Sequence, residues 1–436
     1  MNEAAWRAER DSRSLRYAGR VLNPARWILL RADSDYAARY NGQVALLVAA
    51  NLFGRMIPAL ALDIPAVPIV APLPWAGADL RAFLLKQLFA ADPFGKFESR
   101  TARDGDYILH LGRTGAPAIV HGSGWNLYAG PAPSPLAENE TANPLGPAMA
   151  AILAGAEVFR GALSHPPAFQ LNALTWRAGI APPEAAPLPA GLAPGALWFV
   201  GLGSVGTAIL YILTLATRAF SARLFDMDEV KVHNLDRSPL FLNRHVGWNK
   251  VTAATDYLAG IGMDGVEAET VALDESATWR DRRLGVPDVL VSAANERNVR
   301  AVIENGYPPL QIYGTTGRNW QAAVIRHTPL HDPCSCCLFP ETAHVPTACA
   351  TGSAPQPETG AQVDAALPFL SFAAGAMAAA EILKRGLAGY PFTPNRLILN
   401  TSPHIRTVPA ALSMRAGCLC QRRSRSVHRQ MMGLPT

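Results

Sequence analysis

The sequence predicts an α/β protein with a Rossmann-like fold, arranged as two tandem halves. Three observations support this prediction. A buried strand at Phe199-Val200 leads into a glycine-rich turn and then into an apolar helix. A second unit of this kind, with fewer turn glycines, lies near residues 44–54. Between the two lies a stretch rich in proline and alanine, which has the composition of a linker.

The composition favours a globular protein with neither a membrane nor a nucleic-acid partner. The 436 residues suffice for two or three domains, and 49% are hydrophobic while only 17% are charged. The net charge of +5 is scattered apart from a C-terminal cluster of arginines, which lacks the interleaved aromatic residues that stack on bases. The first twenty residues are charged throughout and lack the apolar segment of a signal peptide, so we expect a cytoplasmic protein.

The uncharged stretch 195–217 is long enough to resemble a membrane span. Three glycines divide it into a strand-like part and a helix-like part, which predicts a buried strand followed by a buried helix.

The N-terminal half, residues 1–180, is predicted to be a degenerate copy of the C-terminal half. The apolar run 44–48 is expected to form a buried strand, and the segment that follows contains only Gly54 as a turn glycine. Without small turn residues, phosphate cannot approach the backbone, so this half should not bind a nucleotide. The alanine-rich segments 156–160 and 380–384 resemble each other and add weak support for a duplication.

The C-terminal half, residues 195–436, follows a linker at 181–194 and opens with a phosphate-binding pattern. Gly201, Gly203 and Gly206 fit G-x-G-x-x-G between a strand and a helix, where backbone N–H groups favour an anion. Asp226 lies twenty residues after Gly206, where a carboxylate would hold ribose hydroxyls. On these residues alone, an NAD-dependent oxidoreductase fits as well as an ATP-binding protein.

Residues beyond the second strand favour ATP. Asn234, Arg237 and Lys250 place a donor and two positive charges there, and a dinucleotide needs no such set. A triphosphate does, because guanidinium and ammonium groups neutralise the charge that develops on departing pyrophosphate.

With these residues, the segment from Phe199 to Cys420 resembles the E1-like adenylyltransferase superfamily, which includes the ThiF and MoeB sulfur-carrier activators and the ubiquitin-activating enzymes. The shared pattern is a glycine turn, an Asp-x-Asp pair, Asn-Leu-x-Arg and a downstream lysine, found here at Gly201 to Gly206, Asp226, Asp228, Asn234, Leu235, Arg237 and Lys250. The resemblance implies an E1 adenylation fold with a degenerate N-terminal and an active C-terminal adenylation domain. It also implies that the turn and Asp226 hold ATP, while Arg237 and Lys250 contact its phosphates.

One position departs from this pattern. The family usually has an Asp-Asn pair after a later strand, and that aspartate helps to bind Mg²⁺. Here the strand 289–292 leads to Ala293-Ala294-Asn295, so Ala294 stands where the aspartate would be. A methyl group cannot ligate a hard cation. Either Asp228 or water replaces that ligand, or catalysis is weak, or the alignment is shifted by one residue; Asn295 remains an expected nucleotide contact.

All six cysteines lie after residue 330, which favours metal ligation and a reactive thiol over a secreted disulfide framework. Four thiolates suit tetrahedral zinc. The resemblance implies a structural zinc held by two cysteine pairs. The expected ligands are Cys334, Cys337, Cys418 and Cys420, and the sequence leaves open whether Cys336, the spare thiol, replaces one of them.

Cys349 stands apart from that group, in a segment 341–366 with few large apolar residues that is expected to be a mobile loop. In the ubiquitin-type activators that this chain resembles, the thioester-forming cysteine lies in this crossover loop, so Cys349 is the expected nucleophile. Such activators also use an arginine from the N-terminal helix of the partner domain, in an R-Y-x-R motif. Arg16-Tyr17-Ala18-Gly19-Arg20 approximates that motif and makes Arg20 a candidate phosphate contact.

The predicted function is that of an E1-like enzyme that uses ATP and Mg²⁺ to adenylate the C-terminus of a ubiquitin-like protein. A thioester on Cys349 would follow, and then transfer to an E2-type protein. The tandem halves make the chain pseudo-dimeric and resemble the activators of bacterial ubiquitin-like conjugation operons, of the BilD type found in anti-phage systems. A ThiF/MoeB-type sulfur-carrier activator, a non-catalytic ATP-binding module and, less favoured, an oxidoreductase are the alternatives; self-association is left open.

Overall fold

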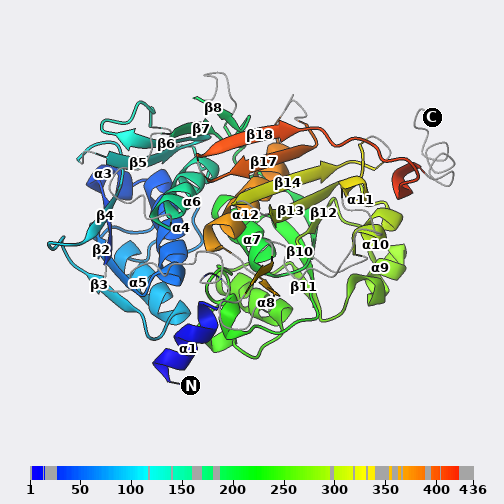
Figure 1. Ribbon diagram of the computed structural model, residues 1–436, viewed down its shortest axis with the longest axis horizontal. Coiled ribbons are helices and arrows are strands. Elements are labelled where there is room, and N and C mark those ends of the chain that lie inside the picture. Colours follow the sequence, from blue (N-terminus) through cyan, green and yellow to red (C-terminus); the bar gives the residue numbers. More distant parts are fainter. Residues whose placement is uncertain are drawn as a thin grey trace.

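The computed structural model describes residues 2–12, 14, 27–115, 118–138, 141–159, 169–179, 187–294, 299–317, 320–329, 332–338, 353–355, 362–364, 367–387, 394–402 and 404–421. The described residues form two eight-stranded sheets that stand side by side, with helices packed between them (Figure 1).

The N-terminal sheet has the strand order β3-β2-β1-β4-β5-β6-β7-β8. Neighbours from β3 to β5 run parallel, and those from β5 to β8 run antiparallel. The strands are β1 (Ile28–Ala32), β2 (Ala59–Asp63), β3 (Lys96–Ser99), β4 (Tyr107–Leu111), β5 (Ala118–Ser123), β6 (Asn126–Pro131), β7 (Phe169–Asn172) and β8 (Arg177–Ala178).

The C-terminal sheet repeats this plan in the order β11-β10-β9-β12-β13-β14-β17-β18. Again the first five strands are parallel and the later neighbours antiparallel. Its strands are β9 (Gly195–Val200), β10 (Phe220–Phe225), β11 (Val266–Glu269), β12 (Val289–Ser292), β13 (Gln311–Gly317), β14 (Gln321–His327), β17 (Arg396–Asn400) and β18 (Arg406–Ala410); a separate two-stranded ribbon pairs β15 (Ser353–Pro355) with β16 (Gln362–Asp364). The tandem α/β fold predicted from the sequence is confirmed by this shared topology.

Four long helices form the core between the sheets: α4 (Tyr40–Met56), α6 (Leu145–Phe159), α7 (Ser204–Ala216) and α12 (Pro368–Lys384). Every residue of α12 is buried, and its many alanines allow α6 and α7 to approach closely. Phe369 of α12 packs on Phe159 of α6, with ring centroids 5.4 Å apart. The two halves therefore share one hydrophobic core.

The remaining helices are shorter than these four. Those of the N-terminal half are α1 (Glu3–Arg10), α3 (Ser34–Ala37) and α5 (Leu80–Ala91). Those of the C-terminal half are α8 (Lys250–Gly260), α9 (Ala277–Arg280), α10 (Val299–Gly306), α11 (Ser335–Leu338) and the short 3-10 turns η1 (Val232–Asn234), η2 (Asn243–His245), η3 (Leu273–Glu275), η4 (Arg282–Leu284) and η6 (Leu419–Gln421).

The strand expected at residues 44–48 is wrong, because those residues lie inside α4. A continuous apolar run does not distinguish a buried strand from a buried helix, and here the run lies in the middle of a helix of seventeen residues. The first strand is instead β1, and Asp33 follows it. The similarity between residues 156–160 and 380–384 reflects real equivalence, because α6 and α12 hold the same place before the antiparallel strands that complete their sheets.

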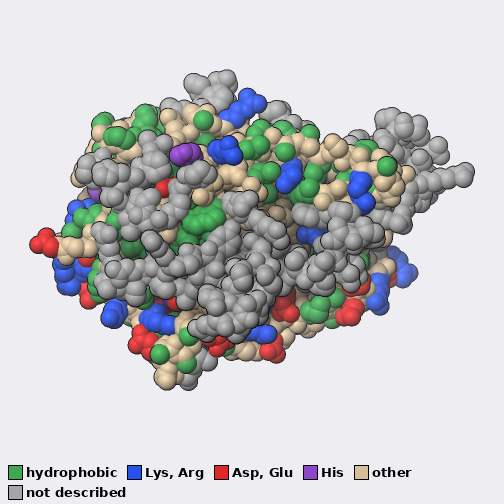
Figure 2. All heavy atoms as spheres, in the orientation of Figure 1, with side chains coloured by type: hydrophobic (Ala, Val, Ile, Leu, Met, Phe, Trp, Pro, Cys, Tyr) green, Lys and Arg blue, Asp and Glu red, His purple; other side chains and the backbone are tan. Residues whose placement is uncertain are grey.

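The uncharged stretch 195–217 forms β9 and α7, as expected. No described helix is long and apolar enough to cross a membrane. In the view of Figure 2, described basic and acidic side chains intermingle along the lower rim of the molecule.

Candidate functional site

The carboxyl ends of three neighbouring strands meet at one edge of the C-terminal sheet. Val200 of β9 pairs with Phe225 of β10 on one side and with Ser292 of β12 on the other. The chain leaves β9 towards β10 on one side, and β12 lies on the other, so this edge is a topological switch point, where α/β sheets usually bind their ligands.

The glycine turn after β9 contains three glycines with three different surroundings. Gly201 has a φ of +88°, and a Cβ there would lie 2.6 Å from the Ala294 amide nitrogen. A Cβ on Gly206 would lie 2.1 Å from the Gly201 carbonyl oxygen. The fold itself therefore requires glycine at both positions. Around Gly203 no described residue other than its two chain neighbours places an atom within 4 Å of the Cβ position, so this glycine leaves open space beside the backbone.

That space lies at the N-terminus of α7. Gly203 is the N-cap residue and offers no side chain to the first-turn amides of this thirteen-residue helix. The unsatisfied amides and the helix dipole favour an anion at this end. An open glycine in front of uncapped amides is the arrangement that admits a phosphate.

Asp226 links the second strand to the glycine turn. Its Oδ2 accepts a 2.6 Å hydrogen bond from the Leu202 amide, and its Oδ1 accepts one of 2.9 Å from the Asp228 amide. Burial raises the pKa of the Asp226 carboxyl, and the charge of Lys250 partly offsets this effect. Asp226 is thus a fixed acceptor at the edge of the turn.

Lys250 begins α8 and lies between the two aspartates. Its Nζ is 2.6 Å from Asp228 Oδ2 and 3.7 Å from Asp226 Oδ1. The Asp228 side chain is 65% exposed, whereas those of Asp226 and Lys250 are about one-tenth exposed. The ammonium group is therefore held in place while one of its carboxylate partners faces solvent.

Arg237 is buried, and a single guanidinium nitrogen, Nη1, makes its hydrogen bonds to other described residues. Nη1 donates to the His233 carbonyl and to Asp236 Oδ1, both at 2.6 Å. Within the described chain, Nε and Nη2 donate no hydrogen bond. Asn234 has a local role, because its Oδ1 accepts a 2.8 Å hydrogen bond from the Lys231 amide and shapes the loop that leads to Arg237.

A cavity of about 250 Å³ opens beside Gly201 and Asp226. Two acidic residues of η3, Asp274 and Glu275, also line it. We did not expect them from the sequence, since no motif surrounds them and only the fold brings η3 to this edge. An apolar pocket with a few polar groups suits a nucleoside; its apolar wall consists of Val200, Phe225, Val271, Leu273, Val299 and Val302.

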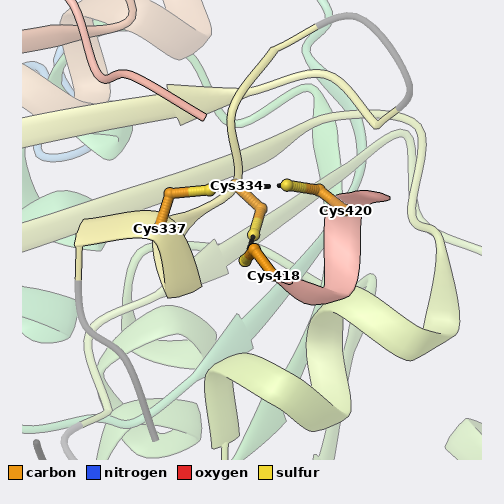
Figure 3. A group of neighbouring side chains, drawn as sticks. All are labelled: Cys334, Cys337, Cys418 and Cys420. Carbon is orange, nitrogen blue, oxygen red and sulfur yellow. Dashed lines mark hydrogen bonds between the residues drawn. The ribbon is translucent and has the colours of Figure 1, made fainter. Parts of the chain in front are cut away.

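The four cysteines expected to hold zinc come together on one side of the C-terminal half (Figure 3). Their Sγ atoms all lie within 4.8 Å of one another. Cys334 Sγ is 3.5 Å from Cys418 Sγ, and Cys337 Sγ is 3.4 Å from Cys420 Sγ. Tetrahedral zinc with Zn–S bonds of about 2.3 Å separates its sulfurs by about 3.8 Å, so this group fits the ion. Cys336 is buried outside the group.

Crowding and burial affect the protonation of these thiols. The neighbouring Cys336 thiol and burial hold the pKa of Cys334 well above its usual value, and burial raises the pKa of Cys337 to about 11. Without a cation Cys334 and Cys337 keep their protons, so a metal that binds them must release protons.

The profile of the ThiF family matches residues 196–420, which is more than half of the chain. The chain belongs to the ThiF family. No protein of curated function matches it in a sequence search.

Among solved structures, the chain is similar to E. coli MccB with ATP, with 16% identity, a TM-score of 0.40 and coverage of 52% of this chain and 66% of MccB. It is similar to the microcin C7 biosynthetic enzyme MccB in complex with N-formylated MccA, with 17% identity, a TM-score of 0.39 and coverage of 52% and 67%. PaaA gives 18% identity, a TM-score of 0.38 and coverage of 50% and 73%. The chain spans just under two thirds of the MccB that binds ATP. These likenesses concern the fold alone.

Three ThiF-type residues expected from the sequence lie outside the described residues: Arg20, Asn295 and Cys349. Ala294 is described. It follows β12, lines the cavity and packs its backbone against Gly201. The side chain of Ala294 at this edge of the cavity is a methyl group, which cannot ligate a hard cation.

The corresponding edge of the N-terminal sheet carries a carboxylate instead of an anion cradle. Asp33 follows β1, and its Oδ2 accepts hydrogen bonds from the Arg113 and Thr114 amides at 2.8 and 2.9 Å. Its Oδ1 lies 2.7 Å from His110 Nε2. A fixed negative charge beside these amides repels a phosphate. This carboxylate agrees with the prediction that the N-terminal half does not bind a nucleotide, and it lies at a different turn from the one that the sequence suggested.

Lys250→Met should change how stability depends on pH. Burial raises the pKa of Asp226 above its usual value of 3.8, so its contribution to stability is present below that value and is lost as pH rises through the folded-state pKa. Removing the ammonium charge should raise this pKa further and extend the loss to higher pH. Carboxyl NMR titration measures the pKa of Asp226, and Lys231→Met, a change at an exposed lysine, is the control. An Asp226 pKa that stays unchanged or falls in Lys250→Met would contradict this account.

Cys418→Ser should weaken zinc binding by at least about a hundredfold, more than a change outside the ligand shell would. Zinc content after dialysis against a chelator measures this effect. Cys336→Ser is the matched control and should keep its metal. Equal loss from both variants would mean that Cys336 belongs to the ligand set.

Proposed function

We propose that this chain activates a carboxylate with ATP. The C-terminal carboxylate of the substrate attacks the α-phosphorus, the bond to the bridging oxygen of pyrophosphate breaks, and an acyl-adenylate forms. The observation that carries the proposal is the open, uncapped backbone at Gly203, which lies in the same turn as Gly201 and beside the Asp226–Lys250–Asp228 group. The site then offers backbone amides to the phosphates, the Asp226 carboxylate to the ribose and an apolar cavity wall to the nucleobase.

In this proposal the nucleobase lies in the apolar part of the cavity and the ribose hydroxyls donate to Asp226. The phosphates follow the amides of α7 towards Lys250 and the Nε and Nη2 donors of Arg237. These charges are fixed before the reaction, so they stabilise the negative charge on departing pyrophosphate without reorganising. Two fixed cations favour a triphosphate over a dinucleotide in this site.

The described residues fit Mg²⁺ only in part. When bound, Mg²⁺ would neutralise charge between the phosphates, and Asp228 is the exposed carboxylate that would hold it together with water. Ala294 supplies no ligand. Asp228 also pairs with Lys250, so any cation at Asp228 competes with that ammonium group for the carboxylate.

The second step of the proposal uses Cys349. Its thiolate attacks the acyl carbon, the bond to the AMP oxygen breaks, and AMP leaves a thioester on the chain. An E2-type cysteine then displaces Cys349 in the same way. The substrate would be a ubiquitin-like protein, and the context a bacterial conjugation operon of the BilD type. The duplicated, degenerate N-terminal half supports this choice over a sulfur-carrier activator.

Ala294 favours a second candidate function, in which the chain binds ATP and a ubiquitin-like tail without adenylation. The two candidates differ in pyrophosphate exchange, which only the enzyme supports. A wild-type chain that binds ATP but exchanges no pyrophosphate with its partner would support the binding function.

Gly203→Ala should reduce ATP affinity by at least about tenfold while leaving the fold intact, because its methyl group meets no protein atom but lies where a phosphate approaches. Calorimetric titration with ATP and thermal unfolding measure the two effects. Gly201→Ala is the contrasting variant, and its left-handed backbone should cost about 1–2 kcal/mol of stability. Unchanged ATP affinity in Gly203→Ala would contradict the proposed phosphate position.

With ATP·Mg and a ubiquitin-like protein that ends in glycine, the chain should form a covalent adduct that reducing agent removes. Cys349→Ala should abolish the adduct but keep pyrophosphate exchange, since the thiolate acts only after adenylation. Non-reducing gels and exchange assays measure these two steps, with Cys336→Ala as the control. An adduct that persists in Cys349→Ala would show that another residue is the nucleophile.

A further inference from the structure

The N-terminal half holds the loop that carries Arg237. This loop, residues 234–239, belongs to the C-terminal half and enters the site from η1. Arg55 of α4 is buried, and its Nη1 donates to the Leu235 carbonyl at 2.7 Å while its Nη2 donates to the Pro239 carbonyl at 3.0 Å. One guanidinium therefore binds the backbone on both sides of Arg237.

Arg55 is itself held rigidly. Asn51, one turn earlier on α4, accepts a hydrogen bond from Arg55 Nε at 2.6 Å and donates to the Pro239 carbonyl at 3.2 Å. Burial lowers the pKa of Arg55 to about 10, which still leaves the guanidinium charged at neutral pH. Arg55 therefore donates to the loop as a charged group at neutral pH.

A second contact comes from the segment after α1. Ser14 Oγ donates to Asp236 Oδ2 at 2.8 Å, and Asp236 Oδ1 accepts the 2.6 Å hydrogen bond from Arg237 Nη1. Asp236 is fully buried, and burial raises the pKa of its carboxyl, whereas Arg237 and Ser14 lower it. Ser14 therefore satisfies the oxygen of Asp236 that Arg237 does not reach.

The segment containing Ser14 is held in place by α1, which lies across both halves (Figure 1). On the N-terminal side, Arg10 of α1 forms an ion pair of 2.5 Å with Asp92, and both side chains are 1% exposed. Trp6 donates through Nε1 to Asn243 Oδ1 of the C-terminal half at 3.2 Å. A helix fixed to both halves leaves Ser14 little freedom to move away from Asp236.

We propose that the N-terminal half, which has lost its own anion cradle, positions the guanidinium of Arg237 for the phosphates of ATP through Ser14 and Arg55. The inference rests on the proposed function. Ser14 and Arg55 are positioning residues, because neither needs to touch the nucleotide. Their effect should therefore depend on whether the ligand has phosphates for Arg237 to meet.

The test compares the affinities of ATP and adenosine by calorimetry in full-length variants. Ser14→Ala should weaken ATP binding by roughly tenfold, the lower end expected for losing a hydrogen bond to a buried charged group, and should leave adenosine binding unchanged. Ser14→Thr retains the hydroxyl and should restore ATP affinity. Ser12→Ala, a matched change in the same segment, should resemble wild type. Arg55→Lys retains the charge, loses one of the two carbonyl contacts and should act in the same direction as Ser14→Ala.

Two results would overturn the inference and leave the proposed function standing. One is a Ser14→Ala variant that binds ATP as tightly as Ser12→Ala does. The other is an equal loss of ATP and adenosine affinity together with a lower unfolding temperature, which would indicate a role in folding alone. A wild-type chain that binds ATP no more tightly than adenosine would overturn both the inference and the proposed function.

Discussion

The hydrogen bond from the Leu202 amide to Asp226 Oδ2 determines the geometry of the site. It fastens the turn after β9 to the end of β10, so the open backbone at Gly203 stays beside the carboxylate. Asp226 then holds the Asp228 amide and attracts Lys250, which brings the start of α8 to the same edge. The left-handed backbone of Gly201 and the close approach of Ala294 complete the floor of the cavity. Each of these contacts depends on Asp226 remaining where the turn needs an acceptor.

The two halves share one topology but have different roles. In the C-terminal half the turn after β9 presents unsatisfied amides, whereas in the N-terminal half Asp33 occupies the corresponding turn with a carboxylate. In the proposed function only the C-terminal copy of the fold binds a nucleotide, and the N-terminal copy supports it. Arg55 and the shared core of α4, α6, α7 and α12 show how extensive that support is.

The sequence predicted the parts of this site that lie close together along the chain. The glycine turn, Asp226, Lys250 and the two cysteine pairs are recognisable because a strand end, a helix start or a short spacing constrains which residues can serve there. The apolar run at 44–48 misled the prediction because a buried helix and a buried strand are equally hydrophobic. The acidic residues of η3 could not be foreseen, since they approach the cavity only through the fold.

Contacts between segments that are far apart in the chain could not be predicted either, because no local pattern encodes them. Arg237 looked like a simple phosphate ligand, yet one of its nitrogens is committed to Asp236, whose other oxygen is bound by Ser14. No local pattern around residue 14 indicates a partner at residue 236. The sequence therefore identified Arg237, but only the structure shows which atoms it contacts.

The position of α1 has a consequence for how the molecule is made. Trp6 and Ser14 meet partners 237 and 222 residues later in the chain. During synthesis the first helix leaves the ribosome long before Asn243 and Asp236 exist, so it can contact Asp92 well before it meets these two later partners. The arginine loop can reach its finished form only after the second half has folded. A chain without its second half therefore cannot form the contacts from Trp6 to Asn243 and from Ser14 to Asp236.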